Sequence, residues 1–301
     1  MKKKQITIIS LFIAAFLIVF GSLTLIAIPT GSFNGNIVLS TQEAYPGETL
    51  RVIITGAKQN ADFCIKFNSK SYEFYPTKDS SYRALIPLPV SIDPGGYVLA
   101  LEYKNFILKK SDLVGEVNIK ESKYKSEKIN FSKSKKKLFN ETINGKGPDK
   151  GRVLLEQAYK TKSAQQLWDG RFMKPTKGRI TSQFGTSRVY DLGKKIQSYH
   201  KGIDLSAAKG TKVYAANDGK VVLAHYLALS GFVVAIDHGQ EVISLYKHLS
   251  KINVEEGKKV LKGEVVGLSG EAGLSTGPHL HWELRVHGVP VEPFSWLSNE
   301  F

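Results

Sequence analysis

The sequence predicts a mainly β protein with an N-terminal transmembrane helix, an immunoglobulin-like β-sandwich and a second β-rich domain. Three observations lead to this prediction. The chain opens with one long apolar stretch, and short segments rich in aromatic and β-branched residues follow it, separated by glycine and proline turns. Helical periodicity is nearly absent after residue 179. The length of 301 residues suits two domains of roughly 100–200 residues each.

Residues 1–29 predict a basic cytoplasmic stub and a transmembrane signal anchor. Lys2, Lys3 and Lys4 precede an uncharged, mostly apolar stretch from Ile6 to Ile28. About 20 such residues cross a bilayer, and lysines before the span stay in the cytoplasm. We therefore expect a single-pass protein of the cell membrane with its domains outside the cytoplasm. The alternative is a cleaved signal peptide, whose apolar region is only about 7–15 residues long, which would leave the protein secreted or periplasmic.

Residues 33–121 predict the immunoglobulin-like module. Strand-length segments alternate with turn signals such as Pro46-Gly47 and Asp93-Pro94-Gly95-Gly96. Short strands at regular spacing are typical of a sandwich. Since no group of side chains there suits metal binding or nucleophilic attack, we expect a spacer or binding module. The single cysteine, Cys64, lies in an apolar run and is expected to be a buried, inert thiol.

Residues 122–176 predict a basic linker with a short helix. Lysines crowd residues 120–137, which is typical of a solvated surface, and apolar residues recur near helical spacing over residues 152–168. The alternative for the lysines is contact with anionic wall polymers or lipid headgroups. The net charge of +15 implies an anionic partner, but no recognised motif indicates nucleic acid and the export signal opposes it.

Residues 177–301 form the last predicted domain and hold all the histidines, each of which follows residue 199. His279 and His281 would face the same side of a strand, and His200 and Asp204 would share a face as well. A catalytic zinc takes three protein ligands from imidazole and carboxylate groups and keeps one position for water. His200, Asp204 and one histidine of the later pair complete that set. The remaining histidine and His248 are then free for acid–base work.

Residues 178–297 resemble the lysostaphin/LytM-type zinc metallopeptidases of bacteria. The segments that carry the resemblance are His200-Lys201-Gly202-Ile203-Asp204-Leu205, residues 210–221, Tyr246-Lys247-His248-Leu249-Ser250, Gly257-Lys258-Lys259-Val260, Gly270 and Gly273-Leu274-Ser275-Thr276-Gly277-Pro278-His279-Leu280-His281-Trp282-Glu283. The resemblance implies an antiparallel sheet beneath a narrow groove that holds an extended peptide.

The same resemblance implies the site roles. It gives one Zn²⁺ ion held by His200, Asp204 and His281, with His279 as general base and His248 as the donor that stabilises the transition state. The implied substrates are peptide stems or cross-bridges of peptidoglycan. Arg188 and Tyr199, which precede the first ligand, are candidate substrate contacts.

The function expected from the sequence is thus a zinc-dependent metalloendopeptidase of cell-wall peptidoglycan. One alternative is a catalytically silent envelope scaffold or amidase activator with the same fold, but the sequence retains every implied ligand and both catalytic histidines. Another is a carrier domain, because residues 254–264 resemble a hairpin of lipoyl and biotinyl domains. No lysine-bearing acceptor turn supports that reading. His225, His238 and His287 are expected to be structural.

Overall fold

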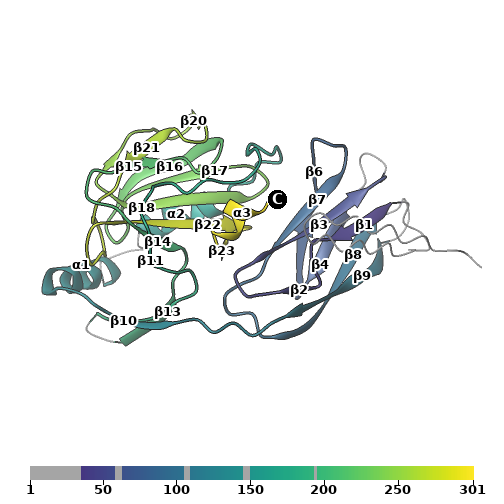
Figure 1. Ribbon diagram of the computed structural model, residues 1–301, viewed down its shortest axis with the longest axis horizontal. Coiled ribbons are helices and arrows are strands. Elements are labelled where there is room, and N and C mark those ends of the chain that lie inside the picture. The colour runs from purple at the N-terminus through teal and green to yellow at the C-terminus, as the bar shows by residue number, and fades with distance from the viewer. Residues whose placement is uncertain (1–34, 58–62, 105–108, 145–149, 193–194) are drawn as a thin grey trace, which may run out of the picture.

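The fold is given by a computed structural model that describes residues 35–57, 63–104, 109–144, 150–192 and 195–301. Most regular structure in these residues is strand, which confirms the prediction of a mainly β protein, and Figure 1 shows two lobes side by side. The predicted transmembrane span, Ile6–Ile28, lies outside the described residues. Within them, no helix combines the length and apolar character needed to cross a bilayer.

The N-terminal lobe consists of two sheets that share one core. The first sheet has the order β1 (Asn36–Leu39), β3 (Thr49–Thr55), β7 (Tyr82–Pro87), β6 (Tyr75–Pro76). The second has the order β2 (Glu43–Ala44), β9 (Lys109–Ile119), β8 (Gly95–Lys104), β4 (Phe63–Phe67), β5 (Lys70–Glu73). Alternate side chains of β3 and β4 are buried, and they meet in the space between the sheets. The period of two in each strand thus produces a two-layer lobe.

Cys64 is less buried than predicted. Its neighbours Phe63 and Ile65 point into the core, so the alternation along β4 turns Cys64 to the outer face, where it is partly exposed. Its Sγ atom lies 3.7 Å from Oε2 of Glu102. The apolar run around Cys64 suggested a buried thiol, but successive side chains of a strand point to opposite faces of the sheet, and only one face of β4 packs in the core.

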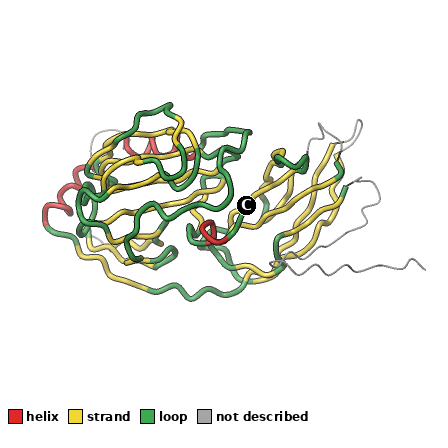
Figure 2. Tube along the Cα trace, turned by 45° about the horizontal axis from the view of Figure 1, so that its top comes forward, coloured by secondary structure: helices red, strands yellow, loops and turns green. Residues whose placement is uncertain are grey.

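The segment between the lobes is more structured than a solvated linker. Figure 2 shows an extended loop joining the lobes along one edge of the molecule. After it, β10 (Ser126–Asn130) pairs in parallel with β12 (Ser187–Asp191), and β13 (Lys195–Tyr199) completes this small sheet. Phe131 is buried and stacks on Tyr190, with ring centroids 6.2 Å apart. From β10 onward this segment therefore packs with the C-terminal lobe.

Two helices follow β10. Ser132 caps α1 (Lys133–Ile143) by accepting a hydrogen bond from the backbone NH of Lys135. The second helix, α2 (Lys150–Tyr159), ends well before the predicted limit at residue 168. Beyond Tyr159 the chain follows the C-terminal lobe instead: Trp168 is fully buried, and the backbone NH of Leu167 donates to the carbonyl of His238 rather than to a helical carbonyl four residues earlier.

The C-terminal lobe is built on an eight-stranded sheet. Its order is β11 (Ile180–Ser182), β14 (Ile203–Ser206), β22 (His279–Val286), β18 (Val242–Leu249), β17 (Gly231–Asp237), β16 (Gly219–Leu227), β20 (Lys259–Val260), and β23 (Val289–Val291) pairs with β22. Every pairing in this sheet is antiparallel. A small sheet of β15 (Lys212–Tyr214), β21 (Val265–Leu268) and β19 (Lys251–Ile252) lies beside it, and α3 (Ser295–Ser298) follows near the C-terminus.

The large sheet is covered on both faces. Tyr246, Trp282 and Leu284 are fully buried in the main core on one face. The opposite face packs beneath α2, where the guanidinium of Arg285 lies over the ring of Tyr159 at 3.8 Å from its centroid. Because residues alternate along β22, the side chains of the odd-numbered residues from His279 to Arg285 share this second face.

The two lobes are joined by buried polar contacts. Arg83 of β7 donates to the carbonyl oxygen of Phe301 at 2.7 Å and lies over the ring of Trp168. The hydroxyl of Tyr75 donates to Oε1 of Glu241 at 2.9 Å. These contacts fix the N-terminal lobe against the edge of the C-terminal lobe. The histidine and aspartate side chains described in the next subsection are not part of this contact.

Candidate metal centre

The pairing of β14 with β22 brings the sequence-predicted ligands together. Asp204 lies directly opposite His281, and the buried Leu205 lies opposite Leu280. His200 lies just before β14, where its backbone NH donates to the carbonyl of Thr186. A short connection and one strand pair therefore place three side chains on the same face of the sheet.

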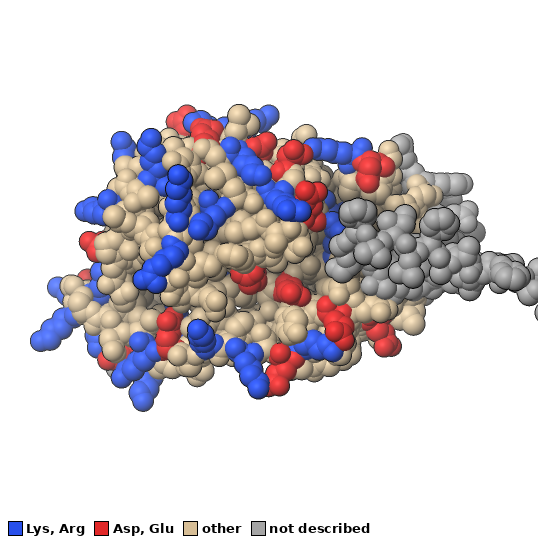
Figure 3. All heavy atoms as spheres, in the orientation of Figure 1, with Lys and Arg blue, Asp and Glu red and all other residues tan. Residues whose placement is uncertain are grey.

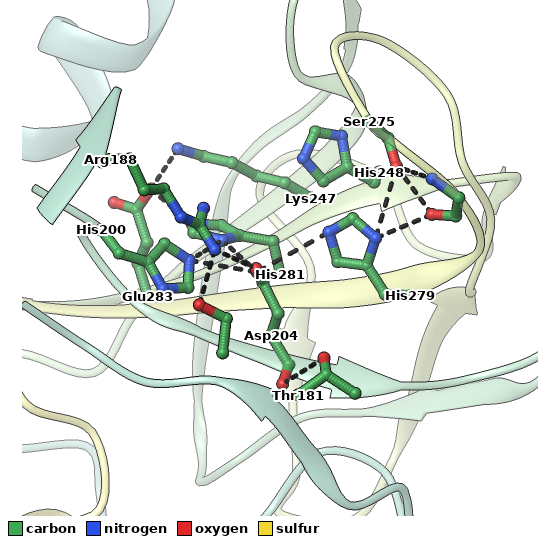
Figure 4. Close-up of polar contacts among 12 residues, drawn as sticks. Thr181, Arg188, His200, Asp204, Lys247, His248, Ser275, His279, His281 and Glu283 are labelled. Atoms are coloured by element: carbon green, nitrogen blue, oxygen red, sulfur yellow. Dashed lines mark hydrogen bonds and ion pairs between the residues drawn. The ribbon is translucent and has the colours of Figure 1, made fainter. Parts of the chain in front are cut away.

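His200, Asp204 and His281 form a compact buried cluster (Figure 4). Oδ1 of Asp204 lies 3.1 Å from Nε2 of His200 and 2.8 Å from Nδ1 of His281. The two ring nitrogens are 3.0 Å apart. Among the described residues, this is the group of histidine, cysteine, aspartate and glutamate side chains whose geometry suits a metal ion.

The other nitrogen of each imidazole is already a donor. Nδ1 of His200 lies 2.8 Å from the carbonyl oxygen of Gln183, and Nε2 of His281 lies 3.0 Å from Oε1 of Glu283. Carbonyl and carboxylate oxygens only accept, so these nitrogens carry the hydrogens and the cluster nitrogens carry lone pairs in the neutral rings. Two lone pairs and a carboxylate oxygen can lie this close only with a proton or a metal cation between them.

Buried charges hold the two carboxylates in place. Burial alone would raise the pKa of Glu283, but Lys247 and Arg285 hold it well below the usual range. Burial likewise opposes ionisation of Asp204, yet when a proton lies in the cluster, hydrogen bonds and charge from His200 and His281 keep the pKa of Asp204 well below its ordinary value. Both groups are therefore anionic at neutral pH, as metal ligation and orientation of His281 require.

Two further histidines lie in the same cavity. Nδ1 of His279 donates to the carbonyl of Gly277 at 2.8 Å, and Nδ1 of His248 donates to the carbonyl of Ala272 at 2.8 Å. The ring centroids are 5.0 Å apart. Both neutral rings thus present the lone pair of Nε2 to the cavity, and Nε2 of His279 lies 3.6 Å from Oδ1 of Asp204.

The backbone explains how His248 reaches this cavity. Lys247 and His248 are consecutive in β18, so a regular strand would point them to opposite faces. His248 instead has φ of 61°, and the pairing of β17 with β18 shifts register nearby, which turns both side chains toward the cavity. Burial and then the charges of His279 and His281 lower the pKa of His248 to about 3. Burial also lowers the pKa of His279.

The cavity above the cluster has a volume of about 340 Å³. Its lining includes apolar side chains from the segment between the lobes and the loop over residues 274–276. Tyr199 lines the cavity and is 41% exposed. Arg188 also lines it, but its guanidinium donates to Asp204, Glu127 and the hydroxyl of Ser182. The arrangement can hold a cation and transfer protons beside an extended ligand.

The other histidines do not line this cavity. His238 is fully buried and bonded to the carbonyl of Asp218 and the hydroxyl of Ser244, and His287 contacts Glu241. His225 is exposed on β16. These positions agree with structural roles.

Sequence reasoning missed Glu283 and Glu127. Glu283 could have been found, because it lies two residues after His281 and therefore on the same face of the strand. Glu127 carries no local signal: it belongs to a lysine-rich stretch and reaches Arg188 only through the parallel pairing of β10 with β12.

Comparison with known proteins identifies the C-terminal lobe. The sequence pattern of peptidase family M23 matches residues 198–293. The chain is 36% identical over 185 residues to peptidoglycan DD-endopeptidase ShyA of Vibrio cholerae, covering 62% of this chain and 40% of that protein. It is 42% identical over 119 residues to DD-carboxypeptidase/endopeptidase Mpg of Neisseria meningitidis serogroup B, covering 39% of this chain and 26% of that protein. The chain thus spans less than half the length of these curated relatives.

A solved structure from Pseudomonas aeruginosa, assigned to peptidase M23, is similar over both lobes. It shares 25% sequence identity with a TM-score of 0.57 and is matched over 84% of this chain and 94% of that chain. The lysostaphin/LytM-type resemblance that the sequence predicts is confirmed. Residues 198–293 of the chain therefore form a domain of the peptidase family M23 type.

Proposed function

We propose that this protein is a zinc-dependent metalloendopeptidase that hydrolyses peptide bonds in the stems or cross-bridges of bacterial peptidoglycan. The observation that carries the proposal is the meeting of two imidazole lone pairs and one carboxylate oxygen within 3.1 Å of one another. The names of the curated relatives support peptidoglycan as the substrate.

The side chains fit a catalytic zinc site. His200, Asp204 and His281 would hold the ion, since two histidines and a carboxylate are a ligand set that leaves a position open for water. When bound, zinc polarises the peptide carbonyl and lowers the pKa of water to about 7. Glu283 orients the ring of His281 through Nε2 and raises the basicity of its ligand nitrogen.

His279 is placed to act as the general base. The carbonyl of Gly277 holds the hydrogen on Nδ1, so Nε2 is the atom that takes the proton from the attacking water. The protonated ring then gives that proton to the nitrogen of the leaving amine. Its lowered pKa favours the neutral, accepting form before the reaction.

His248 is placed to stabilise the oxyanion of the tetrahedral intermediate. With Nδ1 engaged by Ala272, Nε2 is the only ring nitrogen that faces the cavity, and it donates only when it carries a proton. This role therefore requires a second proton on the His248 ring, separate from the one that His279 carries, and the negative charge of the oxyanion would favour it. Tyr199 at the exposed edge is the proposed substrate contact, whereas the engaged donors of Arg188 favour support of Asp204.

We propose in addition that residues 1–29 anchor the protein in the cytoplasmic membrane, with residues 33–121 forming an immunoglobulin-like spacer and residues 177–301 the peptidase outside the cytoplasm. The two shared-core sheets of the N-terminal lobe support the sandwich assignment. Figure 3 shows lysine and arginine side chains spread over the C-terminal lobe, which supports contact with anionic wall polymers or lipid headgroups. Removal of the helix as a signal peptide remains the alternative.

The test is hydrolysis of defined peptidoglycan fragments by the full-length protein purified in detergent, with the products weighed by mass spectrometry. We expect a mass gain of one water per cleaved peptide bond, loss of activity with a chelator and recovery with zinc. A protein that binds zinc but cleaves no fragment, and instead stimulates an added amidase, would support the scaffold alternative. A protein that binds no zinc would contradict the proposal.

A further inference from the structure

The strand between the lobes, β10, delivers a carboxylate to the edge of the metal cluster. In the parallel pairing of β10 with β12, Glu127 lies directly opposite Arg188. Glu127 and Ile129 are half-buried against the C-terminal lobe, while Lys128 between them is exposed. Glu127 therefore belongs structurally to the metal-binding lobe, although it lies far outside the residues that match the family.

Glu127, Arg188, Ser182 and Asp204 form one continuous hydrogen-bonded chain. Nε of Arg188 donates to Oε1 of Glu127 at 2.5 Å, and Nη2 donates to Oδ2 of Asp204 at 2.6 Å. The hydroxyl of Ser182 accepts from Nη2 at 2.8 Å and donates to Oε1 of Glu127 at 3.1 Å. The guanidinium of Arg188 is thus held between the carboxylates of Glu127 and Asp204, and its side chain is only 12% exposed.

This hydrogen-bonded series determines which oxygen of Asp204 faces the metal cluster. Oδ2 is taken by Arg188, so Oδ1 alone turns to His200 and His281. A guanidinium beside a divalent cation also repels it, and the second carboxylate, Glu127, neutralises that charge. Without Glu127, Asp204 would be the only carboxylate in this hydrogen-bonded series that contacts Arg188. Arg188 would then compete with the cation for the oxygens of Asp204.

We infer that Glu127 is a positioning residue of the metal centre, which acts through Arg188 to present one oxygen of Asp204 and to offset the positive charge beside the ion. This inference rests on the proposed function. It also makes the segment between the lobes part of the zinc site, and it assigns a second task to Arg188 beyond lining the cavity.

The test uses three glutamate variants of the full-length protein in detergent. In Glu127→Ala the anchor of Arg188 is lost. In Glu127→Gln an oxygen still accepts from Nε but carries no charge. Glu121→Gln, at an exposed position before β10, makes the same change of charge without a contact to Arg188 and serves as the matched control.

Two readouts are needed, zinc affinity from competition with a chromophoric chelator and the visible absorption of the Co²⁺-substituted protein. Changes to residues that orient metal ligands typically weaken metal binding on the order of 10- to 100-fold. We expect a loss in that range for Glu127→Ala, a smaller loss for Glu127→Gln and no change for Glu121→Gln. The Co²⁺ band of Glu127→Ala should shift, because the carboxylate ligand moves, which a remote loss of stability would not cause.

The outcomes separate the two proposals. If the unaltered protein binds no zinc, the proposed function fails and this inference with it. If the unaltered protein binds zinc and both Glu127 variants bind it equally well with the same Co²⁺ spectrum, the inference alone is overturned. Should Glu127→Ala not fold, Glu127→Gln decides the matter by the same two readouts.

Discussion

Replacing Glu283 by glutamine tests the buried charge network beneath the metal cluster. Glu283 is only 1% exposed, and its Oε2 accepts two hydrogen bonds from Arg285 at 2.8 and 2.9 Å. Its Oε1 accepts from His281 and from Lys247. All these partners are hydrogen-bond donors. The NH₂ group of a glutamine would therefore face either Arg285 or the pair His281 and Lys247, where it would meet another donor and form no hydrogen bond. The variant also leaves the buried Arg285 and the partly buried Lys247 without their shared anion.

The expected cost follows from these contacts. Removing one partner of a buried ion pair typically costs about 3–5 kcal/mol, because the other charge stays buried and uncompensated. We expect Glu283→Gln to destabilise the metal-free protein by about that amount. Zinc affinity should fall as well, on the order of 10-fold or more, because a neutral amide orients the ring of His281 less strongly than the carboxylate does.

The assay is urea unfolding in the presence of a chelator, followed by a zinc competition titration of the folded variant. The control is Glu264→Gln, which removes the same charge from a partly exposed pair with Lys258. That change should cost less than about 1 kcal/mol. A loss below about 1 kcal/mol for Glu283→Gln, with unchanged zinc affinity, would refute the reasoning that this network supports the site.

Three more predictions concern the histidines and the contact between the lobes. His281→Ala should lose both bound zinc and activity, measured by metal analysis and by fragment digestion. His279→Ala should keep its zinc but lose roughly 10²- to 10⁴-fold in turnover, the usual contribution of a general base, and near-full turnover would remove that role. Burial would raise the pKa of Glu241, but interactions with His287, Tyr75 and Lys162 lower it from 4.5 to about 2. A lowered pKa in the folded state gives stability that is complete above pH 4.5 and is lost as the pH falls toward 2. The melting temperature of Glu241→Gln should therefore fall less steeply over that pH range than that of the unaltered protein. Parallel curves for the two proteins would contradict this assignment.

The sequence was sufficient for the β architecture and for the residue types of the site. The spacing of His279 and His281 requires that they share a face in any strand, and in the structure both rings lie beside Asp204. The family resemblance then separated their proposed roles. Spacing alone could not show that β14 pairs with β22 in the register that places Asp204 opposite His281, because that register depends on contacts between distant segments.

Other features depended on long-range packing and were missed for that reason. Trp168 packs in the main core, outside α2, and the local spacing of apolar residues could not distinguish that tertiary contact from a helical face. The parallel strand β10 lies in a lysine-rich stretch, and within the strand itself only Glu127 and Ile129 are half-buried, so its composition is typical of a solvated segment. Lone residues such as Glu127 acquire a role only through the partner strand that the fold supplies.

The central claim is that one zinc ion sits between two imidazoles and a carboxylate, and anomalous X-ray scattering from crystals of the protein at the zinc absorption edge tests it most directly. We predict one strong anomalous density peak that lies about 2.0–2.2 Å from each of Nε2 of His200, Oδ1 of Asp204 and Nδ1 of His281. No peak at this cluster in crystals grown with zinc, or a peak held by a different set of side chains, would contradict the account.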